Sequence, residues 1–145
     1  MAKKSVVVEA KMGEGFWMES RMGEHVLHVD QPAAMGGTDK GPNPLQYFLL
    51  SLGGCIGAIS RIVATQRKLP IRGISLRITG DLDTDVLMGK ANGSRAGFGA
   101  LEVHAEIDAD MTAEEKKAFL AEVDKRCPIS DNIANTTPIA FRLVQ

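Results

Sequence analysis

The chain has 145 residues, with 17 basic and 18 acidic side chains and a formal net charge of −1. This length suits one hydrophobic core, so we expect a single domain over residues 1–145. A charge so close to balance offers no basic surface for nucleic acid or for an anionic membrane. The N-terminus carries two lysines, but its apolar run is only three valines. That run is too short for a signal peptide, so we expect a cytoplasmic protein.

Three short strands are predicted at the N-terminal end, over residues 5–10, 15–19 and 25–29, with glycine-containing turns between them. A loop rich in Gly, Pro and Asp follows over residues 30–43. Together these segments predict a small antiparallel meander that leads into the next element.

A long helix is predicted to begin at Pro44 and to end near Lys68. Asn43 fits the N-cap, and Gln46 fits the position that reaches back to the cap. Apolar residues recur at spacings of three and four, and Arg61 is the only formal charge from residue 45 to 64. Because the helix is apolar on more than one side, we expect it to be buried on more than one side.

A membrane span is the alternative interpretation of that helix, since about 20 apolar residues cross a bilayer. We reject it because glycines and polar side chains dilute the run, and because the flanking segments are typical of strands in a soluble domain. The core of a homo-oligomer explains the same apolar pattern better.

Two alternating segments, residues 71–83 and 101–108, predict an antiparallel pair of strands with one polar face. Residues 84–100, which hold four glycines, are predicted to form the end of that hairpin rather than a linker between domains.

The C-terminal part begins with a complete capping box at residues 112–115, which predicts a helix ending near Arg126. Pro128 then starts a short helical turn to about Ala134, and residues 138–144 predict a final strand. The order of elements defines an α+β fold with antiparallel sheet.

The chain holds two cysteines, Cys55 on the apolar stripe of the long helix and Cys127 just before Pro128. Because the cytosol keeps ordinary thiols reduced, such cysteines are more often thiols or a redox pair than a structural disulfide. Considered alone, Cys55 has the character of a small buried hydrophobe. His25 and His28 point to opposite faces of a strand, so we interpret them as surface histidines and expect neither a metal site nor a cofactor.

Two segments together resemble the OsmC/Ohr family of thiol peroxidases, the osmotically inducible and organic hydroperoxide resistance proteins. They are GPNPLQYFLLSLGGC at 41–55 and RCPISDNIANTTPI at 126–139. The combination is specific, and the resemblance covers essentially the whole chain. It implies an OsmC-like fold in which antiparallel sheets wrap around the long cysteine-bearing helices of an intertwined homodimer, with two active sites at the subunit interface.

The resemblance also implies the chemistry. Cys55 would attack an organic hydroperoxide, Cys127 would resolve the resulting sulfenic acid as a disulfide, and an external dithiol would restore both. Peroxidases of this family place a glutamate in the first turn of the cysteine helix, paired with an arginine that activates the thiol. Here that turn reads Leu45-Gln46, and Arg21 is the only arginine before the helix, which makes it the best match.

A peroxidatic cysteine must be a thiolate. The helix dipole fades within the first turn, and Cys55 lies roughly 16 Å beyond Pro44 along the axis. A cation is therefore needed, with Arg21 as the leading candidate and Arg126 and Lys40 behind it. Two alternatives to a peroxidase stay open: a non-catalytic small-molecule binder that keeps the fold, and a redox sensor whose disulfide changes a partner surface.

Overall fold

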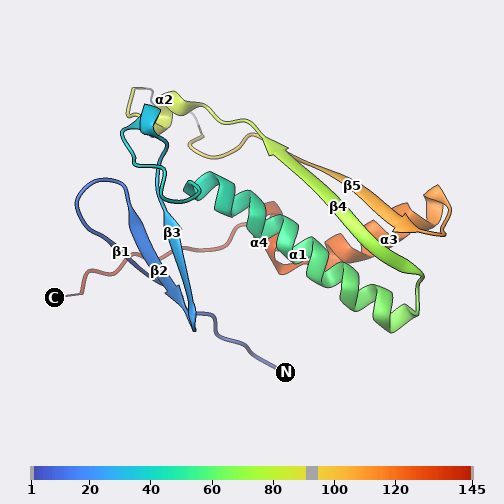
Figure 1. The fold of residues 1–145 in the computed structure, drawn as a ribbon. Coiled ribbons are helices and arrows are strands. Elements are labelled where there is room, and N and C mark those ends of the chain that lie inside the picture. The colour runs from blue at the N-terminus through green and yellow to red at the C-terminus, as the bar shows by residue number, and fades with distance from the viewer. Residues whose placement is uncertain (1, 91–94, 145) are drawn as a thin grey trace. The chain divides into compact units, whose positions relative to one another are not determined.

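The computed structural model describes residues 2–90 and 95–144 (Figure 1). Its internal contacts fall into two compact units, Met1–Leu50 and Ser51–Gln145, and the long helix α1 (Pro44–Arg67) begins in the first unit and continues in the second. The expectation of a single domain stays a prediction.

The first unit holds a three-stranded antiparallel sheet of β1 (Glu9–Met12), β2 (Met18–Met22) and β3 (His25–Val29), with β2 in the centre. The third strand has its predicted bounds, but the first two lie further along the chain than predicted. The start of β1 is set by the length of its partner, β2. Because Glu9 pairs with Arg21 and β2 ends at Met22, before the turn at Gly23, residues before Glu9 soon extend beyond the end of β2.

The loop after β3 is organised by the buried carboxylate of Asp30, which is 1% exposed. Its Oδ1 accepts the backbone N–H of Gln31 at 2.7 Å, and its Oδ2 accepts the hydroxyl and N–H of Thr38 and the N–H of Lys40. These hydrogen bonds to the charged form lower the pKa of Asp30 to about 2. One side chain thus fixes the two ends of a loop that contains the short 3-10 helix η1 (Ala33–Met35).

Helix α1 begins at Pro44, as predicted, and the predicted cap is confirmed. The N–H of Asn43 donates to Oε1 of Gln46, and the N–H of Gln46 donates to Oδ1 of Asn43, both at 2.9 Å. Lys68, with a φ of 53°, ends the helix one residue after Arg67.

The described chain covers one face of α1 rather than several. The buried positions recur with helical spacing; they are Leu52, Ile56, Ser60, Val63 and Ala64. Leu50 and Ile62 remain 64% and 43% exposed. By length and composition alone α1 could cross a bilayer, with a mean hydropathy of 1.7, and the core helix of a soluble protein meets the same criteria. The rejection of a membrane span stays a prediction.

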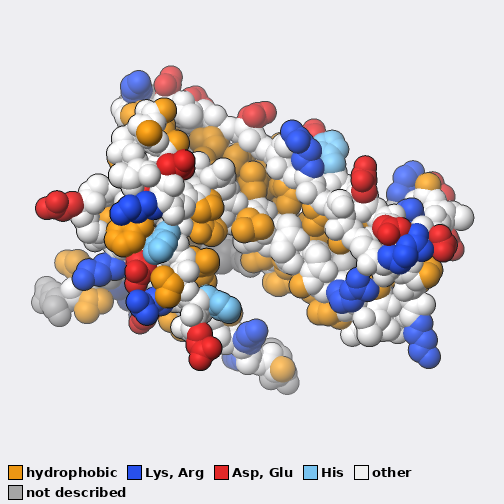
Figure 2. Space-filling view, in the orientation of Figure 1, with side chains coloured by type: hydrophobic (Ala, Val, Ile, Leu, Met, Phe, Trp, Pro, Cys, Tyr) orange, Lys and Arg blue, Asp and Glu red, His pale blue; other side chains and the backbone are white. Residues whose placement is uncertain are grey.

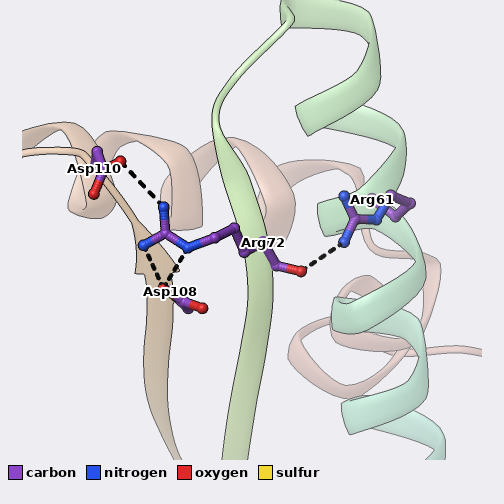
Figure 3. A network of polar contacts seen from close by, with 4 residues as sticks. All are labelled: Arg61, Arg72, Asp108 and Asp110. Atoms are coloured by element: carbon purple, nitrogen blue, oxygen red, sulfur yellow. Dashed lines mark hydrogen bonds and ion pairs between the residues drawn. The ribbon is translucent and has the colours of Figure 1, made fainter.

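In the second unit, β4 (Ile71–Gly80) pairs with β5 (Leu101–Ala109), which confirms the predicted antiparallel pair. The register shifts between Ile71 and Gly73, so Arg72 lies in a bulge. Its side chain bonds to Asp108 and Asp110 on the β5 side, and its carbonyl accepts a hydrogen bond from Arg61 of α1 (Figure 3). The bulge is therefore tied to two neighbouring elements.

The hairpin end between these strands contains the short helix α2 (Thr84–Leu87), and residues 91–94 lie outside the described residues. Helix α3 (Ala113–Arg126) begins with the predicted capping box, in which Thr112 and Glu115 exchange hydrogen bonds. Helix α4 (Pro128–Ala134) also has its predicted bounds.

The predicted strand over residues 138–144 is wrong. Residues 136–144 have no regular secondary structure, and Ile139 and Phe141 are 79% and 95% exposed. The alternating pattern is present, but a strand also requires a neighbour to accept its backbone hydrogen bonds, and no strand in the described residues pairs with this segment.

The hydrophobic core lies in the second unit, where α1, β4, β5 and α3 contribute buried side chains. The members are Leu52, Ile56, Val63, Ala64, Ile71, Ile107, Ala109, Phe119, Val123 and Cys127. Cys55, from the adjacent side of α1, packs against this cluster. Cys127 is therefore part of the core, and Cys55 packs against the edge of the core.

Candidate dithiol site

The fold brings the two cysteines together. The Sγ atoms of Cys55 and Cys127 lie 2.6 Å apart, although 72 positions separate the residues in the sequence. A disulfide bond is about 2.05 Å long. The two free thiols are therefore close enough to form a disulfide after a small side-chain adjustment, once an oxidant removes two electrons and both thiol protons are lost.

Cys127 lies at the junction of two helices, where it is both the C-cap of α3 and the N-cap of α4. This junction positions its side chain. Its extended backbone, with a φ of −84° and a ψ of 110°, interrupts the helical path. Pro128 suits the first position of α4 because that position needs no N–H. The sulfur accepts the backbone N–H of Ser130 at 3.4 Å and is part of a residue only 1% exposed.

The surroundings of Cys55 raise the pKa of its thiol. Burial among apolar side chains is the largest cause, and both the hydrogen bond between the two thiols and the electrostatic effect of Cys127 add to it. The backbone N–H of Ile129 donates to the Cys55 sulfur and lowers the pKa, but by less. These surroundings therefore favour the thiol of Cys55 over its thiolate, and a nearby positive charge would favour the thiolate.

Arg21 and Lys40, two of the three cations considered from the sequence, belong to the first unit. Arg21 lies on β2, and its Nε and Nη2 contact Oε1 of Glu19 at 3.1 and 3.0 Å. The ammonium of Lys40 lies 4.7 Å from the centre of the Trp17 ring. The assignment of either cation to Cys55 stays a prediction.

Arg126 belongs to the second unit, but its guanidinium contacts side chains other than Cys55. Its Nη1 donates to Oε1 of Gln66 at 3.0 Å and contacts Glu122 at 3.4 Å. Gln66 lies about 16 Å beyond Cys55 along the axis of α1. The guanidinium is thus held near the far end of α1.

Two residues beside the cysteine pair, Asp124 and Ser130, were given no role in the sequence analysis, although Ser130 lies in the motif that holds Cys127. The hydroxyl of Ser130 donates to Oδ1 of Asp124, so this bond joins α3 to α4 across Cys127. Both residues lie three positions from Cys127, and that spacing was the available signal. Among the described residues, no group of three or more His, Cys, Asp or Glu side chains could hold a metal ion. The chemistry that this arrangement can perform is thiol–disulfide exchange.

A mixed α+β fold that places a helix cysteine against a second cysteine at a helix junction defines a candidate dithiol redox protein. Residues 37–142 match the family model of the OsmC-like proteins, and the chain belongs to that family. A hydroperoxide reductase of Mycoplasma genitalium is 32% identical over 98 residues, which are 68% of this chain and 66% of that relative. A hydroperoxide reductase of Mycoplasma pneumoniae is 26% identical over 106 residues, 73% of this chain and 72% of that one.

Solved structures confirm the predicted fold. A crystal structure of an OsmC-like protein from Mycoplasma pneumoniae aligns with a TM-score of 0.81 and 23% identity, over 93% of this chain and 91% of that one. An organic hydroperoxide resistance protein from Legionella pneumophila aligns with a TM-score of 0.69 and 24% identity, over 92% and 91%. The α+β, OsmC-like architecture expected from the sequence is therefore established.

Proposed function

We propose that this protein is a thiol peroxidase that reduces organic hydroperoxides with Cys55 and Cys127. The observation that carries the proposal is the 2.6 Å separation of the two sulfur atoms at the edge of the core. The names of the two mycoplasma relatives, both hydroperoxide reductases, support the choice of substrate class.

In the proposed reaction, the thiolate of Cys55 attacks one oxygen of the hydroperoxide and breaks the O–O bond. The alcohol leaves with a proton, and Cys55 becomes a sulfenic acid. The thiolate of Cys127 then attacks the Cys55 sulfur, the S–O bond breaks, and water leaves as the disulfide forms. An external dithiol returns both residues to thiols by two exchange steps.

The sulfur separation sets the direction of approach for the hydroperoxide. Cys127 occupies one side of the Cys55 sulfur at 2.6 Å, so the peroxide oxygen must arrive from another side. Cys55 is partly exposed whereas Cys127 is buried. The substrate therefore reaches Cys55 first, and Cys127 acts only after the first oxidation.

The activating cation in this proposal is Arg21. The raised pKa of Cys55 requires a positive charge, and Glu19 already holds the Arg21 guanidinium through two of its nitrogens. The contact with Glu19 is exposed and holds the guanidinium weakly, so the activation that Arg21 supplies is modest.

We also propose a homodimer in the cytoplasm, where cellular dithiols are kept reduced. Hydrophobic side chains are widely exposed on the face shown in Figure 2. On α1, Leu50 and Ile62 are exposed, and a Cβ atom placed at Gly54 would meet no atom of the described residues within 4 Å outside the adjoining backbone of α1. The C-terminal segment adds Phe141. A second copy that covers such surfaces would remove the cost of leaving them in water.

The raised pKa of Cys55 also favours a second candidate, a redox sensor that forms the disulfide once and slowly. The third possibility, a binder without thiol chemistry, would form no disulfide under hydroperoxide. One experiment with two arms separates the three: incubation of the purified protein with tert-butyl hydroperoxide, in one arm without reductant and in the other with excess dithiothreitol. Consumption of many equivalents per chain supports the peroxidase. Stoichiometric disulfide without turnover supports the sensor, and absence of both supports the binder.

A further inference from the structure

We propose that Asp124 and Ser130 are positioning residues that hold Cys127 in place for disulfide closure with Cys55. The inference deepens the proposed function and rests on it for the order of the two oxidation steps. These two side chains would set the rate of the second step and leave the first unchanged.

The two residues contact Cys127 from both sides. The N–H of Cys127 donates to the backbone carbonyl of Asp124 at 3.1 Å. The N–H of Ser130 donates to the Cys127 sulfur at 3.4 Å. The Ser130 hydroxyl closes the ring by donating to the Asp124 carboxylate. The sulfur, the end of α3 and the start of α4 are therefore linked in one small network.

The junction gains from such a link because α4 packs against the core only through Ile129 and Ile133, which are partly buried. The helix has only seven residues, none of them buried. Pro128 prevents α3 from continuing, so the chain turns at the extended backbone of Cys127. Rotation at this residue would move α4 and carry the sulfur with it. The bond between Asp124 and Ser130 spans this point of rotation.

Position matters most for the closure step. When the Cys55 sulfenic acid forms, the Cys127 thiolate must attack the Cys55 sulfur on the side opposite the departing oxygen. The new S–S bond replaces the S–O bond, and the oxygen leaves as water. A sulfur held beside its target reacts at a high effective concentration. A junction free to rotate would lower that concentration.

The kinetic test compares Ser130→Ala and Asp124→Asn with wild type. Ser130→Thr, which keeps the hydroxyl, serves as the rescue variant. Asp131→Asn serves as the matched control, because the Asp131 side chain bonds to Asn135 at the other end of α4. Rapid mixing with one equivalent of tert-butyl hydroperoxide gives the rate of Cys55 oxidation, and a cyclic diketone that traps sulfenic acid reports how long that species persists.

We expect the first oxidation to keep its wild-type rate in every variant. Closure should slow about tenfold in Ser130→Ala and Asp124→Asn, as loss of a hydrogen bond to a charged group implies, and trapped sulfenic acid should accumulate. Ser130→Thr and Asp131→Asn should close normally. Closure at the wild-type rate in both Ser130→Ala and Asp124→Asn would overturn the inference.

A second readout does not need a hydroperoxide. Equilibration of the Cys55–Cys127 disulfide with dithiothreitol measures how strongly the fold favours the bond. In Asp124→Asn, which conserves side-chain shape, we expect the equilibrium to move about tenfold toward the dithiol, equivalent to about 30 mV for a two-electron couple. If wild type fails to reduce hydroperoxide but this shift is found, the proposed function is wrong and the positioning role stands. If wild type turns over and neither closure nor equilibrium changes, the positioning role is wrong.

Discussion

Each of the two compact units is stabilised internally by a different kind of interaction. In residues 51–145 the buried side chains are mainly apolar and form one core around Val63, Phe119 and Val123. In residues 1–50 the buried side chains among those described are polar, namely Ser20 and Asp30, and each is satisfied by hydrogen bonds. The second unit has a hydrophobic core of its own, whereas the first is organised by polar contacts and leaves apolar side chains such as Phe16 and Val26 exposed.

This difference separates two requirements of the proposed chemistry. The core unit positions the two sulfur atoms, and it also raises the pKa of Cys55 by burying it. The polar unit carries Arg21, the proposed source of the activating charge. Substitutions in the core unit should therefore affect whether the sulfurs meet, and substitutions in the polar unit should affect how fast Cys55 reacts.

The largest expected effect is the loss of peroxide reduction in Cys55→Ser, because the serine hydroxyl is not ionised at neutral pH and cannot replace the thiolate. Cys127→Ser should instead permit one oxidation and then stop at a sulfenic acid that is open to over-oxidation. Mass spectrometry after one and after ten equivalents of hydroperoxide measures both. Equal single-turnover kinetics in wild type and Cys55→Ser would show that Cys55 is not the reacting residue.

Because the two units differ in how much apolar surface they bury, substitutions in them should differ in their effect on the free energy of unfolding. Phe119→Ala should lower the free energy of unfolding by about 3–5 kcal/mol, because it opens a cavity in the core. Val26→Ala, at a strand position 43% exposed in the first unit, should lower it by less than about 1 kcal/mol. Urea unfolding of both variants measures the difference. Similar losses at the two sites would mean that Val26 is covered in solution, as a dimer interface would cover it.

Asp30→Asn tests the polar organisation of the first unit. The pKa of Asp30 is lowered from 3.8 to about 2, so the stability that its charge supplies is fully present above about pH 4 and is lost as the pH falls through 2. Wild type should therefore exceed Asp30→Asn in stability at pH 7, and the gap should narrow steadily between pH 4 and pH 2. Denaturant unfolding at several pH values gives the gap directly. A gap that stays constant down to pH 2 would assign the effect to shape rather than to charge.

Local signals in the sequence predicted local structure well. The caps at Asn43 and Thr112 fixed the starts of α1 and α3, because the hydrogen bonds involved join residues three positions apart. Strand positions depended on distant partners, and β1 and β2 lie further along the chain than predicted. The register of β1 is set by where β2 ends, and residues 138–144 alternate like a strand without any strand among the described residues to pair with them.

The same distinction applies to the candidate site. Cys55 and Cys127 could be found because each lies in a recognisable local motif, but their 2.6 Å separation required the fold. The spacing of Asp124 and Ser130 from Cys127 was visible in the sequence, but the bond between them could not be predicted, because it depends on the angle between α3 and α4. Gln46 was correctly placed in the cap of α1, where its Oε1 accepts the N–H of Asn43.

The cap has a consequence for thiol activation. With its amide oxygen bound to Asn43, Gln46 is less available to hold a guanidinium, and the carboxylate that contacts Arg21 is Glu19 on the same strand. The contact is exposed, and exposed ion pairs are weak. Arg21 should therefore stabilise the Cys55 thiolate only modestly.

The smallest expected effect follows from this weak hold on Arg21. Because the pKa of Cys55 is raised, the rate of its oxidation should still climb between about pH 7 and pH 9 as the thiolate forms. Arg21→Ala should slow the reaction a few-fold, most clearly at the lower pH, while Arg77→Ala, at an exposed position on β4, should not. Leu45→Glu, which adds a carboxylate to the first turn of α1, should hold the arginine better and move the profile to lower pH. Rapid-mixing rates across this range measure all four proteins. A flat profile, together with no effect of Arg21→Ala, would mean that another cation activates Cys55.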